Sequence, residues 1–368
     1  MYNIYKMNAL KSLVPRTQLP QYTPNTEVNF ELIHEGEAYK ANTLFLTGRL
    51  VLVLNGGTVA SQKYYDNFVG VASLLENVNT RCDIYQEVIT NYARHVKHNN
   101  AGTLSADQLC AGLKNSSEML VPHLEHTRLV LHGSQAAGRP FGFSHKLMNS
   151  LNNMSGDLDY AKSGRIQLSF KVPSIQKAFF GADAGTIANY YFTDLELHYL
   201  TVPAGSPSVS IRIVEDTQKL ISTSNTTVMN TFVNPIDNVL VSFATTDSET
   251  DPTQNSLVAQ MPDIKKLSWV YNDQSNRLVA YEIETKEEQI LSGYSVLKSM
   301  GAEIDLRDKI LMATQDTQHS RNDGFIAGLA LGQLLDFSRT GLGLNIKIDN
   351  LTQQYYAYFY GYGTKVLF

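Results

Sequence analysis

Histidines are the first residues in this sequence that could do chemistry. His95 and His98 are three residues apart, as are His123 and His126, so a helix could place either pair on one face. Imidazole is a good zinc ligand, but no cysteine or carboxylate cluster completes either set at a metal-ligand spacing. Cupin enzymes need two histidines separated by one residue, and that spacing does not occur. We therefore interpret these histidines as exposed or interface residues.

Nucleophiles and acid–base pairs are equally poorly supported. The sequence contains no HExxH, no GxSxG and no P-loop. Cys82 follows Arg81 but has no nearby histidine, and Asp157 and Asp159 fall in a segment with a loop composition. An acid–base role would need a pocket that sequence cannot show. We predict no catalytic, cofactor-binding or metal-binding residues, and a protein that is not an enzyme.

A tyrosine-rich run near the end of the chain is the most unusual motif. In an extended strand Tyr356, Tyr358, Tyr360 and Tyr362 share one face. Such a face could stack on sugars or bases. It could also be buried at a barrel or subunit interface, because tyrosine combines a large apolar ring with a polar tip. We favour burial.

Composition limits the class of protein. The chain has 368 residues, 43% hydrophobic and only 18% charged, with 20 tyrosines. Low charge with many tyrosines suits surfaces that are buried against partner subunits, although a β-rich protein would also explain it. The net charge is −5, and no run of Lys or Arg predicts a sequence-specific nucleic-acid partner. No signal peptide and no transmembrane helix are expected, and two cysteines argue against a disulfide scaffold.

Period-two alternation predicts strands in both halves of the chain. In 165–172 the hydrophobic side chains of Ile166, Leu168 and Phe170 alternate with polar ones. This pattern indicates a strand with one face on a core. Gly341, Gly343, Gly361 and Gly363 beside strands predict turns or bulges. Further strands are expected at Val28–Leu32, Thr43–Leu54, Phe192–Val202, Val209–Val214, Val239–Ala244, Leu267–Tyr271, Leu278–Ile283, Phe325–Leu331, Gly343–Asp349 and Tyr355–Phe368.

The chain divides near its middle. Pro203 and Pro207 flank Ala-Gly-Ser and cannot continue a central strand. On each side of this break, an alternating strand is followed by a tyrosine-rich one, which suggests two copies of one β architecture or coincidence between generic strands. We predict an all-β protein with an N-terminal arm (1–24), a first jelly roll (25–205) and a second jelly roll (206–368).

Two helices and the arm complete the prediction. Helices are expected at Ser105–Leu113 and at Glu288–Met300, the second closed by Gly301. In the arm, hydrophobic residues including Leu10 and Leu13 recur at a roughly helical spacing. This pattern is compatible with an amphipathic segment at the inner face of a shell, near lipid, but we favour an arm that packs on a neighbour or is disordered.

In order and style, the elements resemble the double jelly-roll major capsid proteins of tailless icosahedral double-stranded DNA viruses. The resemblance covers most of 28–368 and is weakest across Ser206–Asn238 and Asp247–Pro262, which look like loop or tower insertions. Cys82 replaces the usual acid of an E-D-I turn. The stretches that carry it are Phe30–Leu32, Leu44–Leu54, Gly70–Val78, Cys82–Tyr85, Phe141–Leu147, Tyr191–Leu197, Leu267–Ala280, Ile290–Met300 and Leu342–Ile348.

The resemblance implies a structural protein of the virion, assembled in the host cell. Three chains of two vertical jelly rolls would form a pseudo-hexagonal capsomer that tiles an icosahedral shell. Its partners would be its own copies, neighbouring capsomers, penton and minor capsid proteins, and an internal membrane reached by the arm. The alternatives are a minor virion protein such as a penton, spike or receptor-binding protein, a carbohydrate-binding β-sandwich, and a single-jelly-roll coat protein. The last type often has a strongly basic arm, whereas this arm has three basic side chains, Lys6, Lys11 and Arg16.

Overall fold

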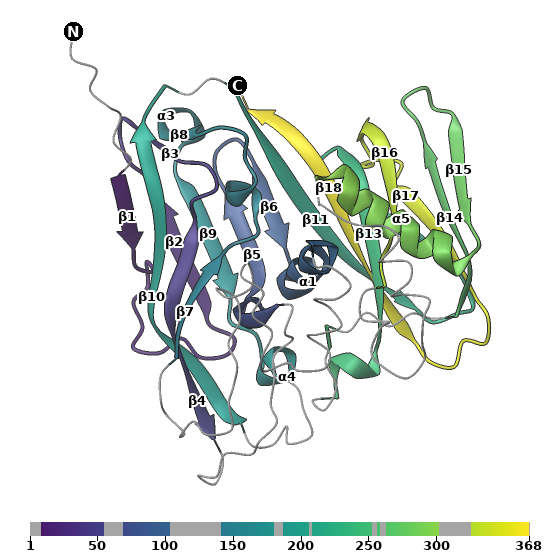
Figure 1. The fold of residues 1–368 in the computed structure, drawn as a ribbon, viewed down its shortest axis with the longest axis horizontal. Helices are drawn as coiled ribbons and strands as arrows, with labels where there is room; N and C mark the ends of the chain where they lie inside the picture. The colour runs from purple at the N-terminus through teal and green to yellow at the C-terminus, as the bar shows by residue number, and fades with distance from the viewer. Residues whose placement is uncertain are drawn as a thin grey trace.

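Two β-sheet bodies lie side by side with helices between them in the computed structural model (Figure 1). The structure describes residues 9–54, 69–103, 141–179, 187–205, 208–251, 256–257, 263–301 and 325–367. No helix in these ranges is long and apolar enough to cross a membrane. The elements up to residue 205 are β1 (Ala9–Leu13), β2 (Glu27–Leu32), β3 (Glu37–Tyr39), β4 (Phe45–Leu54), β5 (Glu76–Arg81), β6 (Gln86–Ile89), α1 (Tyr92–Thr103), β7 (Phe141–Lys146), β8 (Leu158–Asp159), α3 (Tyr160–Ser163), β9 (Ile166–Lys171), α4 (Ile175–Ala178) and β10 (Ile187–Pro203).

The elements of the second body follow after residue 208. They are β11 (Val209–Ile221), β12 (Asn225–Asn230), β13 (Ile236–Thr245), β14 (Ile264–Asn272), β15 (Leu278–Ile283), α5 (Lys286–Ser299), β16 (Ala327–Leu335), β17 (Leu342–Ile348) and β18 (Tyr355–Leu367).

Each body contains two facing sheets with the same strand order. In the first body, β1-β10-β4-β7 form one sheet, extended by β3 and β8, and β2-β9-β5-β6 form the other. In the second, the orders are β11-β18-β13-β16 and β12-β17-β14-β15. Numbered along the chain without β3 and β8, each position in one body has its counterpart in the other, and a helix follows the fifth strand in both. Eight strands in two four-stranded sheets with this order make a jelly roll. The predicted duplication is confirmed.

One sheet continues from body to body. The edge strand β6 of the first body runs parallel to β11 of the second, with Val88 paired to Glu215. The chain itself crosses between the bodies after β10 ends at Pro203 and before β11 begins at Val209. The division at residue 205 remains a prediction.

Strand β10 shows how the sequence sets the inward face. Its side chains Tyr190 and Phe192 point into the core, and so do Leu195 and Leu197. In a regular strand alternate side chains face opposite sides, so these two even-numbered and two odd-numbered residues could not all face the core. Asp194 has a φ of 52°, and the register against β4 shifts between Thr193 and Glu196. This bulge inserts a residue and returns the odd positions to the core.

Several predicted elements are wrong or lie outside the described residues. Ala9–Leu13 forms a strand rather than a helix, because β10 offers an unpaired edge whose hydrogen bonds outweigh a weak helical pattern. Ser206–Asn238 is not an insertion, since it contains β11 and β12. The predicted helix Ser105–Leu113 lies outside the described residues. The other predicted helix is confirmed as α5, which opens with a capping box between Thr285 and Glu288.

Glycines in β18 mark close contacts rather than turns. The ladder from β11 runs unbroken past Gly361 and Gly363, so the predicted bulge or turn there is wrong. A Cβ on Gly361 would lie 2.6 Å from the Phe232 ring, and one on Gly363 would overlap the carbonyl oxygen of Pro235. Only a residue without a side chain lets the 232–236 segment approach this strand.

Replacing Gly363 by alanine should therefore lower the free energy of unfolding by about 3 kcal/mol, because the backbone must move to relieve the overlap. Gly142→Ala is the matched control: it lies in β7, and a Cβ there meets nothing within 4 Å. This control should change stability by less than about 0.5 kcal/mol. Denaturant unfolding followed by circular dichroism measures both, and equal stabilities for the two variants would contradict the packing described.

Candidate functional site

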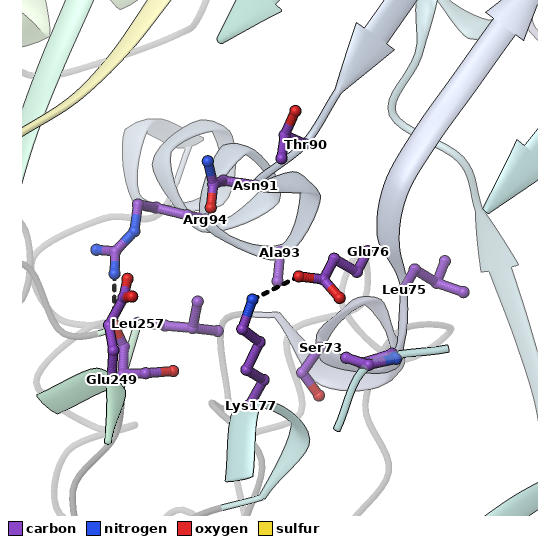
Figure 2. Close-up of a pocket in the computed structure, with 12 residues that line it drawn as sticks. Ser73, Leu75, Glu76, Thr90, Asn91, Ala93, Arg94, Lys177, Glu249 and Leu257 are labelled. Carbon is purple, nitrogen blue, oxygen red and sulfur yellow. Dashed lines mark hydrogen bonds and ion pairs between the residues drawn. The ribbon is translucent and has the colours of Figure 1, made fainter. Parts of the chain in front are cut away.

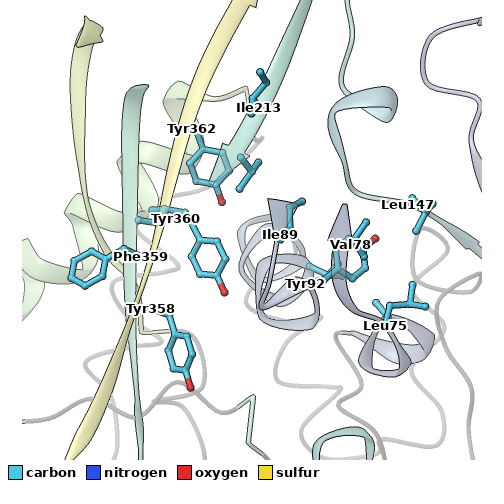
Figure 3. Packing of buried hydrophobic residues seen from close by; sticks show 14 of the residues in the cluster. Leu75, Val78, Ile89, Tyr92, Leu147, Ile213, Tyr358, Phe359, Tyr360 and Tyr362 are labelled. Atoms are coloured by element: carbon cyan, nitrogen blue, oxygen red, sulfur yellow. The ribbon is translucent and has the colours of Figure 1, made fainter. Parts of the chain in front are cut away.

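Strand β18 is buried on both of its faces. The side chains of Tyr358, Tyr360 and Tyr362 point toward α1 of the first body, whereas Phe359 points the opposite way (Figure 3). Phe359 meets Trp269 of the facing sheet edge-on, with ring centroids 6.3 Å apart. The tyrosines share one face, as predicted, and they are buried where the two bodies meet.

Helix α1 supplies the other side of this contact between the two bodies, which we call the joint. The Arg94 guanidinium lies 4.0 Å from the centre of the Tyr358 ring, a cation–π contact. His95 lies beside Tyr360 and Tyr362, with centroid distances of 5.9 and 6.0 Å. His98 meets Tyr360 edge-on at 5.1 Å. His95 and His98 are interface residues but are fully buried rather than exposed.

These histidines do not form a metal site. Among the described residues no group of three or more His, Cys, Asp or Glu could hold a metal ion. Among the residues that the structure describes, neither ring nitrogen of His98 has a hydrogen-bond partner. His123 and His126 lie outside the described residues.

Burial keeps three histidines neutral near the joint. Loss of solvation lowers the pKa of His95 to about 4 and that of His145 to about 3. The pKa of His98 is also lowered well below its usual value, first by burial and then by the positive charges of Arg94 and Lys97. Protonation of any of the three rings would lower the stability of the folded protein.

Two carboxylates tie the bodies together through backbone donors. Asp216 of β11 accepts hydrogen bonds from the backbone N–H of Thr90 (2.8 Å) and of Asn91 (2.6 Å), and from the Asn91 side chain (3.0 Å). These donors directly precede α1, so Asp216 fixes the N-terminus of that helix. Burial nevertheless raises the pKa of Asp216.

Glu87 makes the second tie. Its carboxylate accepts from the N–H of Ser150 (2.7 Å) in the first body and of Val214 (3.0 Å) in the second. Burial raises the pKa of Glu87 to about 7. A carboxylate with that pKa could act as a general base. A substrate could not reach Glu87, because both carboxylate oxygens accept hydrogen bonds from backbone N–H groups and the residue is fully buried.

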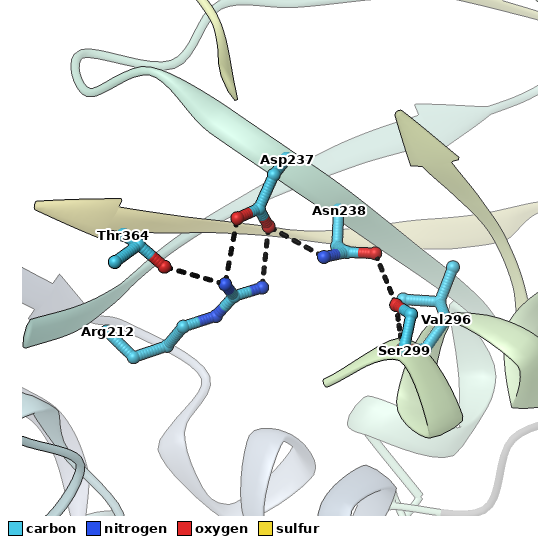
Figure 4. A network of polar contacts seen from close by, with 6 residues as sticks. All are labelled: Arg212, Asp237, Asn238, Val296, Ser299 and Thr364. Carbon is cyan, nitrogen blue, oxygen red and sulfur yellow. Dashed lines mark hydrogen bonds and ion pairs between the residues drawn. The ribbon is translucent and has the colours of Figure 1, made fainter. Parts of the chain in front are cut away.

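A polar network also joins four elements of the second body at the joint (Figure 4). Arg212 binds Asp237 through two hydrogen bonds of 2.8 and 2.6 Å and donates to Thr364 of β18 at 2.8 Å. Asn238 donates to Asp237 and accepts from Ser299 of α5. A bidentate, partly buried arginine pair has a fixed geometry, so this network holds β11, β13, β18 and α5 in one arrangement.

Two cavities open near the joint. The smaller, about 60 Å³, is lined by Arg94, Glu249 and the Lys177–Glu76 ion pair among others (Figure 2). Its volume is too small for a substrate. The larger, about 640 Å³, lies between the bodies. Its described lining residues include His95, Lys146 and Arg212 but no carboxylate pair, so they do not form an acid–base site.

The remaining sequence candidates have structural roles. Asp157 accepts a hydrogen bond from the Ala41 N–H, and Asp159 caps α3 through the Ala161 N–H. Asp159 lies in the short strand β8 rather than in a loop. Burial raises the pKa of the Cys82 thiol, which disfavours the reactive thiolate.

Comparison with solved structures decides the fold. No family model and no curated protein matches the sequence. The PBCV-1 virus capsid matches with a TM-score of 0.62 at 9% identity, over 100% of this chain and 96% of that one. The Faustovirus major capsid protein matches with a TM-score of 0.55 at 9% identity, over 100% and 91%.

The fold is a double jelly roll. Sequence analysis of this double jelly roll missed most of the joint. Asp216 and Glu87 gave no motif, because their partners are backbone groups 125 or more and 63 or more residues away. A single signal could have marked α1: Asn91 stands where a helix cap is favoured, one residue before Tyr92.

Asp216→Asn should destabilise the double jelly roll by about 2 kcal/mol, because the amide nitrogen would face buried N–H donors it cannot accept from. Asp194→Asn is the matched control, since Asp194 is exposed and makes a surface ion pair with Arg49 and a 3.4 Å hydrogen bond from the Thr193 hydroxyl. The control should change stability by less than about 0.5 kcal/mol. Chemical denaturation measures both, and a neutral Asp216→Asn would contradict the role given to this carboxylate.

Acid should also destabilise the fold. Below pH 6.5, His95, His98 and His145 become protonated in the unfolded chain but stay neutral in the folded chain. Each of them therefore lowers the free energy of unfolding by about 1.4 kcal/mol for every pH unit that the pH falls. Glu87 acts oppositely between pH 7 and 4.5, because the folded protein holds its proton more tightly. The net loss should be about 3 kcal/mol per unit between pH 5.5 and 4.5.

Stability measured by denaturant titration at several pH values checks this slope. His98→Leu removes one of the three histidines and should reduce the slope by about 1.4 kcal/mol per pH unit. A free energy of unfolding that is flat from pH 6 to 4.5 would show that these rings are not held neutral.

Proposed function

We propose that this chain is the major capsid protein of an icosahedral virus and that it acts as a homotrimer. The observation that carries the proposal is the fold: two jelly rolls of identical strand order, matched over the whole chain by the PBCV-1 virus capsid and the Faustovirus major capsid protein. Three such chains present six similar barrels, so a trimer can tile a surface as a near-hexagon.

The interior of the molecule supports a structural role over a catalytic one. In the described residues, the strongly perturbed groups His95, His98, His145 and Glu87 are fully buried. Perturbed pKa values at an active site belong to groups that can reach a substrate. Here they follow from packing two barrels against each other, and the protein is proposed not to be an enzyme.

The proposed partners follow from the shell. Copies of this chain and neighbouring capsomers would cover the flat faces, and penton and minor capsid proteins would close the remaining positions. The net charge of −5 offers no support for a sequence-specific nucleic-acid contact. A contact of the N-terminal arm with an internal membrane is part of the proposal, and its first eight residues lie outside the described part of the chain.

Mass measurement tests the proposal directly. Light scattering or native mass spectrometry of the purified full chain should give 3 × 41.0 = 123 kDa. Negative-stain electron microscopy of the same sample should show particles with a hexagonal outline. A chain that stays monomeric at high protein concentration, and shows no such particles, would overturn the assignment.

A further inference from the structure

The joint inside the chain is formed by a defined set of elements from each barrel. The fifth strand of the first jelly roll, β6, lies parallel to the first strand of the second, β11. The helix after that fifth strand, α1, packs on the outer face of the second barrel at Tyr358 and Tyr360 of β18. One barrel thus contributes its fifth strand and helix, and the other its first strand and tyrosine-bearing sheet.

The equivalent elements lie at the two ends of the molecule, where no second barrel of the same chain packs against them. By the internal repeat, β15 and α5 of the second barrel correspond to β6 and α1, and β1 and β10 of the first barrel correspond to β11 and β18. Within the described residues β15 pairs only with β14, and β1 pairs only with β10. Figure 1 places β1 and β15 at opposite ends of the long axis.

Both ends expose apolar side chains. Leu278 and Tyr281 of β15 are 68% and 50% exposed, and Leu10 of β1 is 70% exposed. An apolar edge strand left open to water is a ready template for pairing with another chain. Monomeric proteins usually protect such edges, for example with lysine or proline.

The two corresponding helices differ in how much of them is covered. In α1 the side chains of Arg94, His95 and His98 are all less than 5% exposed, and each lies against a tyrosine of β18 in the second barrel. In α5 one face remains open to solvent, and it includes Leu291 at 36% exposed. The helix of the second barrel therefore lacks the cover that the helix of the first barrel has.

The receiving face differs in the same way. Tyr358 and Tyr360 on the outer face of the second barrel are buried by α1. The outer face of the corresponding sheet in the first barrel carries His198 and Leu200, and these side chains are only partly buried. A neighbour that supplied a helix would complete their burial.

We propose that the β15–α5 end of one copy docks on the β1–β10 end of a second copy and repeats the joint found inside the chain. The contact joins two different surfaces, so it is heterologous and can close into a ring. In a ring of three, all six barrels then meet through one kind of joint. This inference rests on the proposed function and names the surfaces that hold the trimer together.

Lysine substitutions at the two edges test it on the full chain. Leu278→Lys combined with Tyr281→Lys changes the β15 end, and Leu10→Lys changes the β1 end. Each variant should lose the 123 kDa species at concentrations where the wild type is trimeric, because lysine blocks edge pairing. The far-UV circular dichroism spectrum should be unchanged, since all three side chains are exposed within one chain.

Val233→Lys is the matched control. Val233 is 84% exposed and lies between β12 and β13, away from both ends. This variant should remain a trimer. Trimers that survive both edge changes would overturn the inference and leave the proposed function standing, whereas a wild type that is monomeric would overturn both.

Mixing the two edge variants distinguishes the kind of contact. The β15 variant keeps an intact β1 end, and the β1 variant keeps an intact β15 end. One good joint should therefore form in the mixture and give a two-chain species of 2 × 41.0 = 82 kDa. If β15 instead pairs with β15 of another copy, the Leu10→Lys variant alone will still associate, and that result would overturn the inference.

Discussion

The arrangement of the molecule depends on a strand that has no solvent face. Strand β18 is covered by the sheet of its own barrel on one side and by α1 of the other barrel on the opposite side. Its alternating residues must therefore satisfy two packing environments at once. Phe359 and the glycine at position 361 face the core of the second barrel, and the tyrosines face the joint. Neither barrel can shift along this strand without disturbing the other.

Burying a joint rich in polar side chains requires partners for them. Unpaired polar groups in an interior cost free energy, whereas paired ones orient their neighbours. Asp216 and Glu87 accept backbone N–H groups across the joint, and the Tyr360 hydroxyl donates to the carbonyl of Asn91. In the part of the chain that the structure describes, neither ring nitrogen of His98 has a hydrogen-bond partner. Its ring remains neutral because burial removes its solvation and because a proton there would face Arg94 and Lys97.

The sequence predicted the long strands because their cores impose alternation, as in Ile166–Lys171 and Leu342–Ile348. It could not predict α1. That helix is buried by residues that normally face water, such as Arg94 and His95, so no hydrophobic stripe marks it. Strands β5 and β6 are short and carry buried polar residues, including Glu87, for the same reason. Tertiary contacts with the other barrel decide these elements, and a local pattern cannot encode them.

A polar joint limits the relative orientation of the barrels more than an apolar one would. Apolar surfaces slide with little change in energy, because burial depends on area and not on direction. Hydrogen bonds weaken steeply when their angles change, and Asp216 and Glu87 accept hydrogen bonds that cross from one barrel to the other. The two barrels are therefore held at a fixed angle within the chain. A tile whose edges must meet those of identical neighbours needs this rigidity, because an angular error would be repeated at every contact.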